Sequence, residues 1–271
     1  MEYAWLDRDE EDLQRAVELL ESPSFVARLA DLIGIPVEAL FKALPATTSG
    51  KIMSVVDTSL RKTLDVAVRT LDARGGPRPA RNLTHKLAVG FSGGVGGAFG
   101  IAALGAELPV STTLMLRSIA DIARSEGEDL GSVASQLECL SVFALGGRTQ
   151  DDDAAESGYF TARAGLAVAV RDAAQYIARR GLADASAPPI ARLIARISAR
   201  FGGVVAEKIA AHGVPIVGAI GGATINVLFM DHFQDVARGH FTIRRLERAY
   251  GPEPVAARYE EIRRRLESVG D

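Results

Sequence analysis

The sequence predicts an all-α fold, a multi-helix bundle built around two glycine-rich helical hairpins. Apolar residues recur at spacings of three and four along most of the 271 residues, which is typical of helices with one buried face. No segment shows the strict alternation of a β-strand. Glycine and proline clusters divide the chain into pieces of helix length. We expect an N-terminal helical region, residues 1–79, to pack on a helical core, residues 80–271.

Four helices are expected in the N-terminal region. Ser22-Pro23 combines an N-cap with a first-turn proline, so a second helix should follow the first at this point. A third helix should begin near Pro36, and the fourth should end before the glycine- and proline-rich residues 75–79. The apolar stripes of the first, second and fourth helices comprise Leu13, Ala16, Val17, Leu20, Phe25, Val26, Leu29, Ile33, Leu60, Leu64, Val68 and Leu71.

The second half of the chain is punctuated in the same way. Pro109 is expected to precede one helix, Gly146-Gly147 to end another, and Pro188-Pro189 to start a third. The helices predicted before the C-terminus are residues 111–125, 130–145, 159–180 and one from Pro188. The last helix should carry Val255, Tyr259, Ile262 and Leu266 on one face.

A weak internal repeat relates residues 112–124 to residues 226–238 without a gap. The identical positions are Leu114/Leu228, Asp121/Asp235, Ala123/Ala237 and Arg124/Arg238, and each copy follows a glycine-rich apolar stretch. The shared context predicts a duplicated helical hairpin.

The two apolar stretches are residues 87–106, which contain no charged residue, and residues 209–230. The first is long enough to span a membrane. Glycines four apart, such as Gly90 and Gly94 or Gly218 and Gly222, form a smooth strip on which another helix can pack closely. The stretches could therefore insert into lipid or form a buried hairpin of a soluble bundle. The many glycines and the lack of a flanking Trp/Tyr belt favour the buried hairpin.

Charge and cysteine content narrow the class of protein. The net charge is −3, which provides no broad basic surface for nucleic acid, so no nucleic-acid partner is expected. The single cysteine, Cys139, rules out an internal disulfide framework and is expected in the core. Acidic residues fill the N-terminus where a signal peptide would be apolar. We expect a cytoplasmic protein, with peripheral attachment to the inner membrane as an alternative.

One catalytic motif occurs in the first glycine-rich stretch. Residues 90–94 match G-x-S-x-G, in which Ser92 would be the nucleophile of a hydrolase. That motif requires a preceding strand, and none is predicted here. A triad of Ser92 with His212, His232 or His240 is disfavoured, although the sequence leaves it open.

The densest polar segment is residues 231–240. On a helix, Asp231, Asp235 and Arg238 would share a face, with His232 to one side. No established metal-ligand spacing is present, so neither a metal nor a cofactor is predicted and a structural network is favoured. The alternatives are a metal-dependent or acid–base site and a ligand or partner site. The candidate catalytic residues are thus Ser92, His232, Asp235 and His240.

A comparable polar line occurs in the first repeat, and it adds ligand or partner candidates. Arg117, Asp121 and Arg124 are spaced to share a helix face, and Glu107 follows the uncharged stretch. If Glu107 is buried it needs a partner, for which Arg117 and Arg124 are the obvious residues. The full set of ligand or partner candidates is Glu107, Arg117, Asp121, Arg124, Asp231, His232, Asp235, Arg238 and His240.

Over roughly residues 60–259 the chain resembles the EcsC protein family. The resemblance rests on the glycine-rich stretch running into Glu107-Leu108-Pro109, on residues 116–124 and 214–219, and on Asn226. It also rests on the segments Asp231-His232-Phe233 and His240-Phe241 with residues 244–247. The family is helical and is named for a bacterial protein encoded beside an ABC transporter. Membership implies no catalytic residues.

Three functions remain in view. The first is a non-enzymatic helical protein acting at a membrane surface or on a membrane protein, as an accessory to a transporter or secretion system. The second is a peptidase-like hydrolase or a metal-dependent enzyme. The third is a protein that binds lipid or another apolar ligand. No particular small-molecule substrate is indicated.

Overall fold

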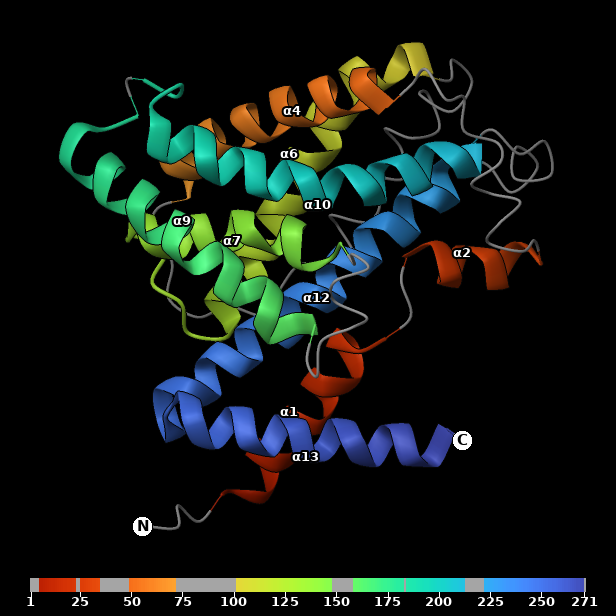
Figure 1. The fold of residues 1–271 in the computed structure, drawn as a ribbon, viewed down its shortest axis with the longest axis vertical. Coiled ribbons are helices and arrows are strands. Elements are labelled where there is room, and N and C mark those ends of the chain that lie inside the picture. Colours follow the sequence, from red (N-terminus) through yellow and green to blue (C-terminus); the bar gives the residue numbers. More distant parts are fainter. Residues whose placement is uncertain are drawn as a thin grey trace.

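The computed structural model describes residues 5–22, 25–34, 49–71, 101–147, 158–182, 184–212 and 222–270. Within these ranges the protein is helical and contains no strand, which confirms the predicted all-α fold (Figure 1). The helices are α1 (Asp7–Leu20), α2 (Phe25–Ile33), α4 (Ser49–Thr70), α6 (Ile101–Ser125), α7 (Val133–Leu145), α9 (Gly158–Arg180), α10 (Pro188–His212), α12 (Gly222–Tyr250) and α13 (Pro252–Gly270).

Helix α7 forms the centre of the main bundle. It packs against α4, α6, α9, α10 and α12, and nearly all of its residues from Ser135 to Ala144 are buried. A helix that is apolar on every side is stable only when other helices cover it completely. Its N-terminus is capped by Ser132, whose side chain accepts a hydrogen bond from the Ser135 amide at 3.1 Å.

Helix α12 connects the main bundle to a second, smaller group of helices. Its first half packs on α6 and α7, while its second half packs against α1 and α13 (Figure 1). The smaller group has its own apolar cluster, formed by Leu13, Ala16, Val17, Tyr159, Ile243, Leu246, Val255, Tyr259 and Ile262. Gly251, with a φ of 91°, allows the sharp turn between α12 and α13.

Most expected helix positions agree with the structure, but the helix expected to begin after Pro109 includes this proline and begins earlier. α6 runs through Pro109 from Ile101 to Ser125. The Ser111, Thr112 and Thr113 hydroxyls donate back to the Leu108 and Pro109 carbonyls of the preceding turn. At the other end of the chain, Val255, Tyr259 and Ile262 are buried as predicted, whereas Leu266 is 36% exposed.

The two glycine-rich stretches lie largely outside the described residues. So do the third expected helix near Pro36, the break at residues 75–79 and the boundary proposed between residues 79 and 80. The two copies of the weak repeat lie in α6 and α12, which pack against each other. The duplication and the two glycine hairpins themselves stay predictions.

Among the described helices, none combines the length and the apolar character needed to cross a membrane.

Candidate functional site

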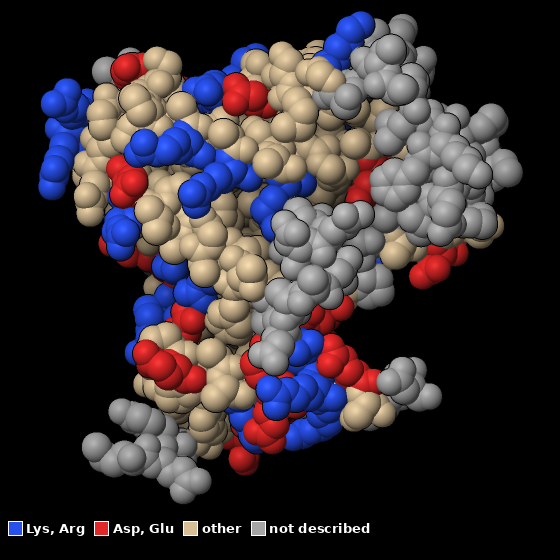
Figure 2. Space-filling view, in the orientation of Figure 1, with Lys and Arg blue, Asp and Glu red and all other residues tan. Residues whose placement is uncertain are grey.

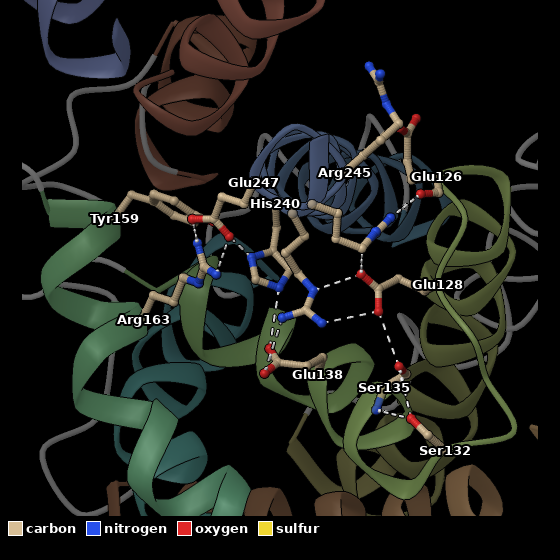
Figure 3. A network of polar contacts seen from close by, with 12 residues as sticks. Glu126, Glu128, Ser132, Ser135, Glu138, Tyr159, Arg163, His240, Arg245 and Glu247 are labelled. Carbon is tan, nitrogen blue, oxygen red and sulfur yellow. Dashed lines mark hydrogen bonds and ion pairs between the residues drawn. The ribbon is translucent and has the colours of Figure 1, made fainter. Parts of the chain in front are cut away.

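A group of largely buried polar side chains surrounds His240, in the second half of α12 (Figure 3). The His240 side chain is 0% exposed. On one side of its ring, Nδ1 lies 2.9 Å from the hydroxyl of Tyr159 in α9. On the other side, Nε2 lies 3.5 Å from a carboxylate oxygen of Glu138 in α7. His240 therefore lies at a point where three helices bring titratable groups together.

The surroundings of His240 favour its neutral form. Burial lowers the pKa of His240, and the attraction of Glu138 only partly opposes this effect. Because Nε2 faces a carboxylate, we infer that Nε2 carries the proton and that Nδ1 accepts the hydrogen bond from the Tyr159 hydroxyl. Burial also raises the pKa of Tyr159, so its hydroxyl stays protonated and able to donate.

Two arginine–glutamate pairs flank this centre. Arg163 of α9 donates two hydrogen bonds to Glu247 of α12, at 2.7 and 2.6 Å. Arg244 of α12 donates two to Glu128 at 2.8 and 3.1 Å. Its third nitrogen lies 3.6 Å from Glu138. Two-point pairing of this kind fixes both side chains as well as neutralising them, so it holds α12 in register with α9 and α7.

Glu128 precedes α7 and accepts more than the Arg244 pair. Arg248 of α12 also donates to it, and so does the Ser135 hydroxyl at 3.1 Å (Figure 3). Burial alone would raise the pKa of Glu128, but the hydrogen bonds and charges of Arg244 and Arg248 outweigh burial and lower it. Glu128 is therefore an ionised anchor between the start of α7 and the second half of α12.

His232, the second histidine candidate on α12, has a different role. Its Nε2 lies 2.7 Å from the carbonyl oxygen of Gly146, at the end of α7. Arg200 of α10 donates to the neighbouring Ala144 and Gly147 carbonyls at 2.8 and 2.5 Å. The last carbonyls of a helix have no partner within the helix, so His232 and Arg200 together cap the C-terminus of α7.

Two of the remaining candidates on α12, Asp235 and Arg238, form an ion pair that is partly exposed. Asp235 accepts from Arg238 at 2.6 Å and from Arg28 of α2 at 3.1 Å. Asp231 lies partly buried on the same helix. In the first repeat, Arg124 donates to Asp121 at 3.2 Å, and Arg117 is exposed on α6. Asp121–Arg124 and Asp235–Arg238 thus pair alike at equivalent positions of the two copies.

Glu107 is mostly buried, and its partner is not an arginine of its own helix. Lys208 of α10 donates to Glu107 at 2.7 Å, and Asn226 of α12 donates at 3.0 Å. The Lys208 side chain is 1% exposed and lies over the Phe229 ring at 4.9 Å. Burial lowers the pKa of Lys208, and Glu107 opposes that change. The partners suggested by the sequence, Arg117 and Arg124, therefore do not fill this role.

The candidate catalytic residues do not form one site among the described residues. His240 is held by Tyr159 and Glu138, whereas His232 and Asp235 contact other groups. Ser92 and the His212 side chain lie outside the described residues. Where side chains are described, no group of three or more His, Cys, Asp and Glu is placed to hold a metal ion. Cys139 is buried as predicted, and burial raises its thiol pKa.

Several residues of the network were not singled out in the sequence, chiefly Glu128, Glu138, Arg163, Lys208 and Arg244. For one of them a signal was present. Glu138 is the only charged residue of α7, which is otherwise apolar, and a charge in a fully covered helix must find a partner. On α12, His240, Arg244 and Glu247 are spaced by four and three, so they share one helix face. The partner of that face was not readable from the sequence.

Comparison with known proteins gives one match. The family model described as the EcsC protein family matches residues 11–246, from within α1 to the second half of α12. This range includes the whole polar network except Glu247 and Arg248. No curated protein and no solved structure matches the chain. The helical architecture and this match, which extends over most of the chain, show that the protein belongs to the EcsC protein family.

Proposed function

We propose that this protein is a non-enzymatic helical docking protein that acts at the inner face of a membrane, as an accessory to a transporter or secretion system. One observation supports this proposal most directly: the described catalytic candidates take part in contacts between helices. His240 joins α12 to α9 and α7, His232 caps α7, and Asp235 joins α12 to α2.

The geometry around His240 supports a structural role over an acid–base role. A general base must lie within hydrogen-bond reach of the proton that it takes from a substrate. Both ring nitrogens of His240 already face side chains of the protein, and none of the ring is exposed to solvent. The arginines and glutamates around it are paired with each other as well. Such a network specifies how helices pack.

The test is fractionation of the native protein between cytosol and membrane, followed by separate high-salt and carbonate washes of the membrane pellet. We expect part of the protein in the pellet, released by either wash, together with a membrane protein that can be cross-linked to it before washing. A protein found entirely in the cytosol would refute the membrane role. Retention after carbonate would mean that the chain inserts into lipid and would refute peripheral docking.

A further inference from the structure

Helices α9 and α10 form a continuous outward face on the main bundle (Figure 2). They are joined by the short segment 181–187 and run antiparallel, side by side (Figure 1). Arg192 of α10 lies 3.7 Å from Asp172 of α9, and Arg196 donates to the carbonyl of Gly165. These contacts fix the two helices in register, so their outward side chains belong to one surface.

This surface is strongly basic. Figure 2 shows Lys and Arg side chains gathered over α9 and α10, with few carboxylates among them. Of the eight Lys and Arg in the described residues from 158 to 212, five are exposed arginines, whereas only one of the three Asp and Glu, Asp184, is exposed. The whole chain, in contrast, has a net charge of −3. We call the outward face of α9 and α10 the arginine face; its exposed arginines are Arg171, Arg179, Arg180, Arg192 and Arg196.

The charges of the arginine face are largely uncompensated. In the part of the chain that the structure describes, no carboxylate lies within ion-pairing distance of Arg171, Arg179 or Arg180. The Arg192 guanidinium is 60% exposed although it approaches Asp172. Elsewhere the arginines of this protein are mostly paired, as Arg163, Arg244 and Arg245 are. Unpaired arginines concentrated on one face produce a positive potential that attracts an anionic partner.

Small side chains lie beside these arginines, in the turns of α9 that precede Arg171. The outward positions of α9 include Ala164, Gly165, Ala167 and Val168, and Val168 is 50% exposed. A face of arginines beside small and apolar residues can approach a flat surface closely, with the guanidinium groups on phosphates and Val168 at the headgroup level. Arg residues also bind phosphate oxygens in a two-point geometry. A phospholipid headgroup layer has both the flatness and the anionic phosphates.

We propose that the arginine face is the surface by which this protein docks on a membrane containing anionic phospholipid. The inference rests on the proposed function and deepens it, because it names both the docking surface and the partner. Each arginine near an anionic bilayer contributes to binding, and the contribution is reduced by salt. Binding should therefore depend on lipid charge and on ionic strength, and it should require no membrane protein.

The experiment is sedimentation of the full-length purified protein with vesicles. One set is phosphatidylcholine alone, and the other is equal parts phosphatidylcholine and phosphatidylglycerol. The test variant is Arg171→Glu/Arg179→Glu/Arg180→Glu. The control, Arg8→Glu/Arg15→Glu/Arg264→Glu, changes the charge equally at exposed positions of α1 and α13. All these side chains are at the surface, so unchanged circular dichroism and unfolding midpoints should show that both variants fold.

We expect the wild type to bind only the anionic vesicles and to dissociate in high salt. The test variant should lose more than about 100-fold in affinity, since the loss of three arginines alone accounts for about that factor and the three glutamates add repulsion, while the control should bind like the wild type. The neutralising variant Arg171→Gln/Arg179→Gln/Arg180→Gln should fall between them. Equal binding to both vesicle types, or equal losses in test and control variants, would overturn the proposal.

The competing partners are tested in the same assay. Polyadenylate RNA, a polyglutamate peptide and additional phosphatidylglycerol vesicles are each added as competitors, at matched concentrations of negative charge. If the RNA or the peptide displaces the protein at a lower concentration than the added vesicles do, the arginine face binds a different anion and the proposal is wrong. Failure of the vesicle assay with a native protein that still sediments with membranes would overturn only the lipid inference. Vesicle binding by a protein that is entirely cytosolic in cells would overturn the proposed function instead.

Discussion

At the scale of single residues, burial determines what the polar groups can do. His240, Glu138 and Lys208 occupy positions where an unpaired charge would be costly, and each faces a partner on another helix. The sequence indicated His240 as a member of the densest polar segment and Glu107 as the carboxylate that follows the uncharged stretch. It could not indicate Tyr159 or Lys208 as their partners, because these lie 81 and 101 residues away along the chain.

The lowered pKa of His240 predicts a pH dependence of folding stability. The unfolded chain binds a proton at His240 below its ordinary pKa of 6.5, but the folded protein resists this proton. The free energy of unfolding should therefore decrease as the pH falls from 7.5 to 5.5, by at most about 1.4 kcal/mol per pH unit for one proton. Urea unfolding at several pH values measures it.

Two variants separate this effect from a general loss of stability. His240→Gln should reduce the change of the unfolding free energy with pH over the same range, whatever the absolute stability of the variant. Tyr159→Phe retains the histidine but removes the hydrogen bond to Nδ1, so it should lower the stability and keep the slope. A slope that persists unchanged in His240→Gln would mean that another group is responsible.

At the scale of helices, close approach explains where glycine is needed. A Cβ at Gly146 would lie 2.5 Å from the Phe233 ring, and a Cβ at Gly147 would lie 2.6 Å from the Arg200 carbonyl oxygen. The sequence predicted that α7 ends at this pair of glycines. It could not predict why, because the crowding comes from α10 and α12.

A second close crossing, between α12 and α1, occurs at Gly239. A Cβ at this position would lie 2.6 Å from Leu20 Cγ and 3.1 Å from the Ala16 carbonyl oxygen. Gly239→Ala should therefore destabilise the protein by about 1–3 kcal/mol, since α1 must shift away from α12. Chemical denaturation measures the change.

A matched substitution should change the stability in the opposite direction. Gly203 lies in the interior of α10, is exposed and has no atom within 4 Å of the position that a Cβ would occupy. Gly203→Ala should stabilise the protein by about 1 kcal/mol through helix propensity alone. If Gly239→Ala were stabilising as well, the tight contact between α1 and α12 would be wrong.

The positions of the helices were largely predictable from the sequence, whereas some helix termini depend on tertiary contacts. Apolar spacing, Gly146-Gly147 and Pro188 are local signals, and the structure follows them. Pro109 is the exception, because a proline's local preference to end a helix is outweighed where the surrounding chain continues it. The polar network was the least predictable, since it forms only after α7, α9 and α12 have come together.

At the scale of the whole molecule, charge is unevenly distributed although the net charge is small. α1 carries six acidic and two basic residues, while α9 and α10 present the arginine face. The net charge of −3 conceals this separation. No local signal in the sequence shows that Arg171 and Arg192 lie on the same surface, because their proximity depends on the antiparallel packing of two helices.

Arg245 joins distant parts of the molecule. It donates to Asp9 at 2.8 Å and Asp12 at 2.7 Å, both in α1, and to Glu126 at 2.9 Å. The side chain is 32% exposed, so we discount the energy of these pairs for solvent screening. Arg245→Ala should lower the free energy needed to detach α1 from α12 by about 1 kcal/mol. Hydrogen exchange of the α1 amides should therefore become about fivefold faster.

The rest of the molecule provides the control for this prediction. Amides in α7 should exchange at the wild-type rate, because α7 is enclosed by the main bundle. Arg265→Ala, which removes only an exposed pair with Glu261 within α13, should leave α1 unchanged. Unaltered exchange in α1 of the Arg245 variant would show that apolar contacts alone hold that helix.

The contact between α1 and α12 affects the order in which the protein can assemble during synthesis. Arg245 follows Asp9 by 236 residues, so α1 leaves the ribosome well before its partner on α12 is synthesised. At about 5–20 residues per second this delay is about 10–50 s. During that time Leu13 and Val17 have no partner from α12 or α13, and the carboxylates of α1 keep the exposed helix hydrated. We therefore expect the acidic residues of α1 to reduce aggregation of the nascent chain before this helix contributes to the folded protein.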